Sequence, residues 1–207
     1  MPFEILLKGF VVTISLIVAI GAQNAYVLKL GLLKQHVLKA ALMCIFFDFV
    51  LISAGVFGLG FFVQGNQLLI NSIAIVGILF LTFYAFLSFK SAFKNTSLKI
   101  DDETKTSPLK QVLSLILVFT FLNPHTYLDT VVLIGGIGAN IENGLKIYFL
   151  IGAVSASAFW FLSLGFGARF LIPLFKKPVT WKILDICIGI IMLLIAYGLL
   201  DLIKEIK

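Results

Sequence analysis

The stretch LSLILVFTFLNPHTYLDTVVLIGGIG, residues 113–138, combines a long apolar run with a polar interruption near its middle. A bilayer core needs about 20 mostly apolar residues in a helix, and this run is long enough. Four polar or helix-breaking residues nevertheless fall within about two helical turns: Asn123, Pro124, His125 and Asp129. Because a proline removes a helical hydrogen bond and strains the preceding turn, the sequence predicts a membrane helix that is broken near Pro124.

The whole chain has the composition of a membrane protein. Of its 207 residues, 60% are hydrophobic and 13% are charged, and its mean hydropathy is +1.10. Soluble domains contain about 45–50% apolar and about 25% charged residues, so this chain departs from them on both counts. The two cysteines, Cys44 and Cys187, stand in apolar runs without a metal-ligand or C-x-x-C spacing. We expect both to be buried apolar side chains.

Six runs of the sequence are long and apolar enough to cross a bilayer. They cover residues 3–27, 38–63, 68–89, 111–137, 146–172 and 181–203. The segment 90–110 between the third and fourth runs is rich in Ser, Thr, Lys and Asp. Since it is too short for a core of its own, it is predicted to be a polar linker. The predicted fold class is an all-α integral membrane protein with six transmembrane helices.

The positions of the basic residues predict the orientation in the membrane. The loops after the first, third and fifth runs share one side and hold 12 of the 16 Lys and Arg residues, Lys29 among them. The positive-inside rule places this side, with the linker 90–110, in the cytoplasm and both termini outside. Five full spans instead of six would place the N-terminus inside. The net charge of +6 is explained by the basic residues of the cytoplasmic loops. It therefore does not indicate a nucleic-acid partner, and none is predicted.

The two halves of the chain, 1–89 and 111–207, resemble each other weakly. ILFLTFYAFLSF (78–89) aligns without gaps with IMLLIAYGLLDL (191–202), so that their tyrosines coincide. Each half has three runs, and because three is an odd number, the second half must cross the membrane in the opposite sense. The sequence therefore predicts two inverted three-helix repeats, a plan typical of secondary transporters.

A second helix break is predicted in the first run. This run holds IGAQNAYVL where the fourth run holds FLNPHTYLD, and Asn24 falls opposite Asn123. Gly21 weakens the helix, and the amides of Gln23 and Asn24, like Asn123 and His125 in the other half, are suited to cover loosened backbone. In an inverted repeat such breaks build the substrate site, where free amides hold a carboxylate and free carbonyls hold an ammonium. A kink that serves packing alone is the structural alternative.

Two acidic residues lie well inside predicted spans. An Asp at the centre of a span costs about 2.5–3.5 kcal/mol on insertion scales and normally marks an ion or substrate path. Asp48 lies in the second span and Asp129 in the fourth, with no Lys or Arg nearby inside either span, so both are predicted to face a cationic substrate. For Asp48 the alternative is a structural hydrogen bond to a neighbouring helix. Asp185, at the start of the sixth span, is expected at the membrane interface.

Catalytic chemistry is not indicated. His125 is a candidate proton relay because histidine titrates near neutrality, and a hydrogen-bonding role beside the helix break is the alternative. The sequence contains no metal-ligand cluster, no nucleophile with a base and no phosphate-binding loop, so we predict no cofactor, no metal and no enzyme activity. A membrane thiol–disulfide carrier is disfavoured because Cys44 and Cys187 do not occupy equivalent spans.

Two segments carry a resemblance to a known family. GAQNAYVLKLGLLKQHVLKAALMCIFFDFVLISAGVFGLG (21–60) and FLNPHTYLDTVVLIGGIGA (121–139) closely resemble the LysE/ArgO family of bacterial basic amino acid exporters. The first carries the G-A-Q-N-A of the family and the second its N-P-H-x-Y-L-D-T. Related branches that export neutral amino acids usually have P-G-P in place of A-Q-N and lack the L-D-T ending, so the chain is similar to the LysE/ArgO branch.

The resemblance implies an exporter of L-lysine, L-arginine or both in the bacterial cytoplasmic membrane, driven by the proton motive force. It implies Asp48 and Asp129 as the essential charged positions. The residues that match the helix-break motifs of the family are Gln23, Asn24, Asn123 and Pro124. The expected partners are a basic amino acid and the lipid bilayer, and a homo-oligomer is left open. An exporter of neutral amino acids or of a metal cation is the alternative, and family members described with five spans conflict with the count of six.

Overall fold

The computed structural model confirms the predicted all-α membrane class. The part of the chain that it describes forms helices joined by short turns, without a strand. Most of the predicted linker 90–110 lies outside this part, and the division of the chain into two repeats stays a prediction. The described residues are 1–18, 21–59, 67–93, 107–173 and 178–204.

The helical elements follow one another in a simple order. The α-helices are α1 (Pro2–Ile17), α2 (Ala22–Leu32), α3 (Val37–Ala54), α5 (Gln67–Phe93), α6 (Leu109–Phe121), α7 (Pro124–Tyr127), α8 (Gly135–Ala139), α9 (Lys146–Gly167) and α10 (Pro178–Lys204). Two wider π-helical segments, η1 (Gly55–Leu59) and η2 (Leu128–Ile134), extend α3 and join α7 to α8, and the 3-10 turn η3 (Ala168–Leu171) follows α9.

Two of the predicted spans are bent pairs of helices. α1 and α2 meet at 84°, and α6 meets the helical segment from His125 to Ala139 at 70°. Four other helices are long and apolar enough to cross a membrane singly, so the described residues give four candidate spans, or six when each bent pair counts as one. The expected end of the first span near residue 27 is wrong, because α2 continues to Leu32. Lys29 therefore lies in a helix and not in a loop.

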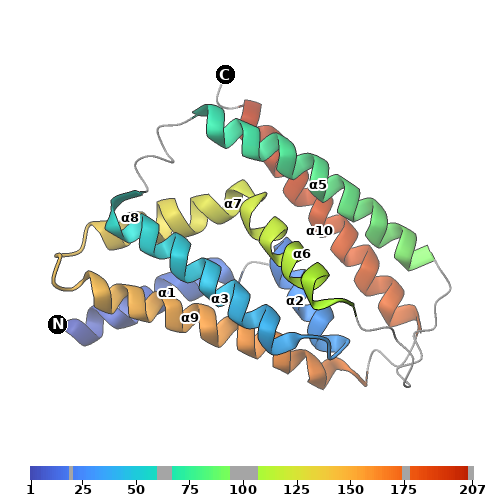
Figure 1. Ribbon diagram of the computed structural model, residues 1–207, viewed down its shortest axis with the longest axis horizontal. Helices are drawn as coiled ribbons and strands as arrows, with labels where there is room; N and C mark the ends of the chain where they lie inside the picture. The colour runs from blue at the N-terminus through green and yellow to red at the C-terminus, as the bar shows by residue number, and fades with distance from the viewer. Residues whose placement is uncertain (19–20, 60–66, 94–106, 174–177, 205–207) are drawn as a thin grey trace.

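Two long helix pairs organise the bundle, and each joins the two halves of the chain (Figure 1). α1 packs along α9, and α5 packs along α10. The first pair depends on glycine, because a Cβ on Gly9 would meet the Phe149 carbonyl and a Cβ on Gly152 would meet the Leu6 carbonyl. Such close backbone contact through small residues is common between membrane helices.

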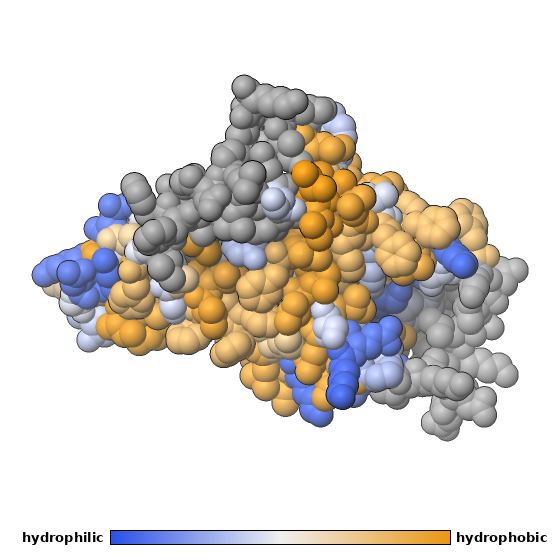
Figure 2. Space-filling view, turned by 45° about the horizontal axis from the view of Figure 1, so that its top comes forward, coloured by the Kyte–Doolittle hydropathy of each residue, from blue (hydrophilic) through white to orange (hydrophobic). Residues whose placement is uncertain are grey.

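The outer surface is apolar, as expected for helices that face lipid. Large aromatic side chains project outward from α3, α5 and α9, and Phe46, Phe86 and Phe159 are each more than half exposed. Figure 2 shows hydrophobic side chains over much of one face, with hydrophilic ones gathered at the left end and along the lower edge. Cys187 belongs to this outer surface and only Cys44 is buried, so the prediction for Cys187 is wrong. An apolar run does not tell which of its faces meets lipid.

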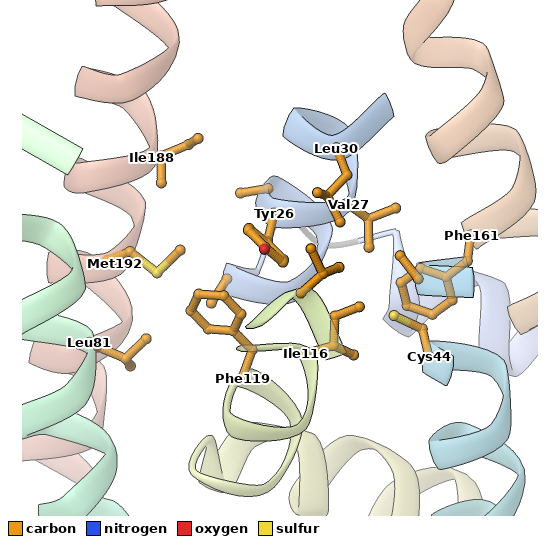
Figure 3. Close-up of a cluster of buried hydrophobic side chains, with 14 of the residues drawn as sticks. Tyr26, Val27, Leu30, Cys44, Leu81, Ile116, Phe119, Phe161, Ile188 and Met192 are labelled. Atoms are coloured by element: carbon orange, nitrogen blue, oxygen red, sulfur yellow. The ribbon is translucent and has the colours of Figure 1, made fainter. Parts of the chain in front are cut away.

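α2 lies within a buried cluster that joins the parts of the bundle (Figure 3). Its Tyr26 and Leu30 lie between the α5–α10 pair on one side and α6 on another, while α3 and α9 border the cluster across from α10. The ring centroids of Tyr26 and Phe119 are 5.5 Å apart. α2 is therefore a central packing element of the bundle. Its position determines where Gln23 and Asn24, in its first turn, lie.

Candidate functional site

The first helix break lies between α1 and α2. α1 ends at Ile17, and Gly21 stands in extended conformation directly before α2. A helix end leaves carbonyl groups without helical partners, and the Asn24 side-chain amide donates to the Ile17 carbonyl at 2.8 Å. Trp160 of α9 donates its indole N–H to the Asn24 side-chain oxygen at 3.3 Å. Asn24 thus covers backbone that the break exposes, and a gating role of Gly21 stays a prediction.

The second break separates α6 from α7. α6 ends at Phe121 and α7 begins at Pro124, a first helical position that suits proline because its missing N–H is not needed there. The Asn123 side-chain oxygen accepts the backbone N–H of His125 at 3.2 Å. The Phe121 carbonyl instead accepts the Tyr127 hydroxyl at 3.0 Å. Asn123 covers loosened backbone as expected, whereas Tyr127 was not singled out from the sequence.

A cavity of about 300 Å³ opens between the two breaks. Apolar side chains of α1, α9 and α10 complete its wall. Pro124 begins α7, and its gating role stays a prediction. The other residues proposed for the site from the sequence all border this one cavity: Gly21, Gln23, Asn24, Asp48, Asn123, His125 and Asp129. Their meeting is observed, and their roles in binding stay predictions.

Asp48 is buried at the wall of the cavity and hydrogen-bonded to another helix. Its side chain belongs to α3 and is 4% exposed. The hydroxyl of Ser157 in α9, itself fully buried, donates to Asp48 Oδ2 at 2.6 Å. The hydrogen bond to a neighbouring helix, which was the structural alternative for Asp48, is therefore present. Asp48 also borders the cavity, because a carboxylate that accepts one hydrogen bond can still accept others.

Ser157 was missed in the sequence because nothing local distinguishes it. It stands in the run GAVSASA, two residues after Ser155. Ser155 is exposed and donates to the Ile151 carbonyl of its own helix at 2.7 Å, which is the usual bond of a serine in an apolar helix. Only the packing of α9 against α3 turns Ser157 and not Ser155 toward Asp48.

Asp129 approaches the same cavity from the second bent pair. It lies half-buried in the π-helical segment η2, and π-helical turns are often found at functional sites. His125 precedes Asp129 by four residues and borders the same cavity. Within the described residues neither Asp48 nor Asp129 forms a salt bridge with a lysine or arginine. This part of the chain also contains no group of three or more His, Cys, Asp or Glu that could hold a metal ion.

Gln23 borders the cavity and contacts the neighbouring helices. Its side-chain oxygen accepts the Thr120 hydroxyl at 3.3 Å, which connects α2 to the end of α6. Its amide nitrogen is buried and lies near the buried Cys44 thiol of α3. Gln23 therefore connects α2 to both neighbouring helices at the edge of the cavity, and its role in binding stays a prediction.

Asp185 forms a buried ion pair. It is 6% exposed, and its Oδ1 lies 2.6 Å from the Lys29 ammonium. The Ser91 hydroxyl donates to Asp185 Oδ2 at 2.7 Å. The pairing was not predicted from the sequence, because α2 is longer than predicted and carries Lys29 into the bundle, where a buried carboxylate can pair with it. The position of Asp185 at the membrane interface stays a prediction.

The geometry defines a membrane transporter. Two helices broken within an apolar bundle, with exposed backbone and buried polar side chains around one cavity, form the kind of site at which secondary transporters bind their substrates. Residues 14–201 match the LysE type translocator family, and the chain belongs to this family. It is a transporter and not an enzyme, and the resemblance seen in the sequence is confirmed.

Two relatives cover nearly the whole chain. The chain is 36% identical over 197 residues to YggA of Aeromonas salmonicida, described as a proposed amino-acid transporter, with 95% of this chain and 96% of the relative covered. It is 34% identical over 192 residues to the arginine exporter protein ArgO of Salmonella paratyphi A, with 93% of this chain and 91% of the relative covered. No solved structure matches the chain significantly.

Proposed function

We propose that the protein exports basic L-amino acids, arginine, lysine or both, across the bacterial cytoplasmic membrane. The observation that carries the proposal is a cavity bordered by two carboxylates, Asp48 and Asp129, without a basic partner among the described residues. A carboxylate removed from water is costly unless a cation is near, so the cavity favours a ligand that brings positive charge. The relative named as an arginine exporter supports the substrate class and the direction of transport.

The size and polarity of the cavity suit one amino acid. Its volume of about 300 Å³ lies at the lower end of small-molecule sites, which range over about 300–1,000 Å³. In our proposal Asp48 and Asp129 receive the side-chain cation. The first N–H groups of α2, from Ala22 to Asn24, receive the carboxylate, because a helix N-terminus offers free donors and a partial positive charge. The apolar wall contacts the aliphatic stem.

Transport requires the cavity to open on each side of the membrane in turn. We propose that 1–89 and 111–207 are inverted repeats that rock about the site, with the linker 90–110 in the cytoplasm and both termini outside. The pairing of equivalent helices, α3 with α9 and α5 with α10, supports this symmetry. In the same proposal the proton motive force drives export, since protonation of one carboxylate neutralises it and weakens its hold on the cation, with His125 as a relay.

The test is transport of labelled arginine by the purified protein in liposomes with an imposed proton gradient. Asp48→Asn and Asp129→Asn should each reduce transport more than about tenfold, because truncating one partner of a buried charge pair costs about 2–5 kcal/mol. Glu4→Gln is the control, since that exposed carboxylate pairs only with the chain N-terminus, and its transport should be unchanged.

Arginine transport that survives both Asn substitutions contradicts the site. Transport of homoserine or of a divalent metal cation in place of arginine and lysine contradicts the basic substrate class.

A further inference from the structure

A second cavity, of about 320 Å³, lies between α2, α5 and α6. Among the described residues it shares no lining residue with the first cavity. α2 borders both cavities: Gln23 faces the first, and Tyr26, Lys29 and Leu33 follow at helical spacing along the wall of the second. An amino acid that moves along α2 would therefore meet both cavities in succession.

A packed aromatic cluster borders the second cavity. The Tyr26 and Tyr84 rings line the second cavity, and their centroids lie 5.5 Å and 4.9 Å from that of Phe119. Figure 3 shows Tyr26 of α2 and Phe119 of α6 facing each other between the two helices. Phe119 is buried, and the residue after it, Thr120, contacts Gln23 of the first cavity. The aromatic cluster thus connects the wall of the second cavity to residues at the edge of the first.

A buried carboxylate lies behind the wall of the second cavity, and its counterion comes from the chain itself. Lys29 and Ser91 both line the cavity, and behind them Asp185 accepts one bond from each, at 2.6 Å and 2.7 Å. Asp185 is almost fully buried, while the Lys29 side chain retains 23% exposure. A lysine ammonium is a compact charge on a flexible stem, so Lys29 can turn away from Asp185 while its stem stays on α2.

The rest of the chamber suits the two ends of an amino acid. Leu30, Leu87 and Leu115 provide an apolar wall for an aliphatic stem. Gln111 provides an amide group able to bind an α-carboxylate or an α-ammonium. Gln35 also lines the cavity, and its side-chain oxygen accepts the Ser107 backbone N–H at 3.2 Å. The volume is close to that of the first cavity, so a ligand that fits one chamber fits the other.

We propose that the second cavity is a further binding site for a basic amino acid, in which the Lys29 ammonium occupies the cation position on Asp185 until the side chain of the substrate replaces it. The proposal rests on the basic substrate class of the proposed function. Lys29 acts as a tethered competitor, because its ammonium is the same chemical group as that of a free lysine. Replacement keeps Asp185 paired and releases the bond that connects α2 to α10.

The experiment measures equilibrium binding of labelled arginine to the purified full-length protein in detergent. All variants carry Asp48→Asn, which removes a carboxylate of the first cavity. Adding Lys29→Met should tighten arginine binding about tenfold or more, because a tethered group competes at an effective concentration in the millimolar range. Adding Asp185→Asn to Lys29→Met should abolish this tight binding. Citrulline, which has the shape of arginine without its charge, should not compete.

Lys182→Met is the matched control on α10. Its ammonium lies over the Phe93 ring, 5.1 Å from the centroid, one helical turn before Asp185 and outside the lining of the cavity. This substitution should leave arginine binding at the level of the Asp48→Asn background. An affinity unchanged by Lys29→Met, or tight binding that persists after Asp185→Asn, overturns the proposal.

Loss of Lys29 leaves a buried carboxylate with Ser91 alone, so folded yield is the second measurement. Purification of Lys29→Met in millimolar arginine should raise the yield of folded protein, whereas millimolar citrulline should not. Equal yields in the two amino acids overturn the proposal. Because both measurements are made at equilibrium without a gradient, they do not depend on transport. Absence of arginine transport by the unmodified protein overturns the proposed function instead.

Discussion

Replacing Ser157 by alanine tests whether Asp48 must be held in place for transport. The substitution removes one hydroxyl, which lies 2.6 Å from the Asp48 carboxylate, and leaves the small apolar surroundings of the serine intact. A hydrogen bond to a charged group contributes about 1.5–3 kcal/mol. Since about 1.4 kcal/mol is a factor of ten in an equilibrium constant, arginine affinity should fall by about tenfold to about a hundredfold.

The assay is the concentration dependence of arginine transport in liposomes. Ser157→Ala should raise the half-saturating concentration more than it lowers the maximal rate, because the carboxylate remains present but is no longer oriented. Ser157→Thr keeps the hydroxyl and should retain most of the affinity. Ser155→Ala removes a serine of the same helix that bonds only its own backbone and should change nothing. Equal half-saturation for Ser157→Ala and Ser155→Ala would refute the role given to the Asp48 contact.

Three further predictions concern stability in detergent. Gly152→Ala places a Cβ against a carbonyl of α1 and should lower the unfolding free energy by about 1–3 kcal/mol, whereas Gly167→Ala, with open space at its Cβ, should unfold like the unmodified protein. Tyr127→Phe removes the hydroxyl bonded to the last carbonyl of α6 and should cost about 1 kcal/mol; an unchanged unfolding temperature contradicts that contact. Lys29→Ala should lower the unfolding free energy by about 3–5 kcal/mol. Lys29→Met combined with Asp185→Asn should restore most of this unfolding free energy, so a double variant as unstable as Lys29→Ala argues against the ion pair.

The two helix breaks were predictable because their causes are local. Proline fixes its own backbone and lacks an N–H, and glycine before an amide pair weakens a helix, so FLNPHTYLD and IGAQNAYVL signal their breaks without tertiary information. The convergence of Gln23, Asp48 and Asp129 on one cavity could also be anticipated, because an intramembrane carboxylate has to face the interior of the bundle.

Other features depend on which face of a helix meets which neighbour. Ser155 and Ser157 are equivalent in sequence but only the second contacts Asp48. Lys29 and Asp185 are 156 positions apart, and their pairing follows from the extra turn of α2 and the place of α10 beside it. An almost uniformly apolar helix carries no period that reveals its buried side, which is also why the exposure of Cys187 was not foreseen.

During synthesis α1 and α5 enter the membrane long before their partners exist. α1 has its main packing surface on α9, and α5 on α10, which is made after every other described helix. Until the second half is made, the packing surfaces of the first half, including Gly9 of α1, have no partner in the bilayer. Partly assembled chains of this kind are prone to misassembly and degradation. Chains that terminate before α10 should be degraded by membrane quality control, although all the earlier helices are already made. Synthesis of the last described helix therefore determines whether the earlier helices remain in the membrane.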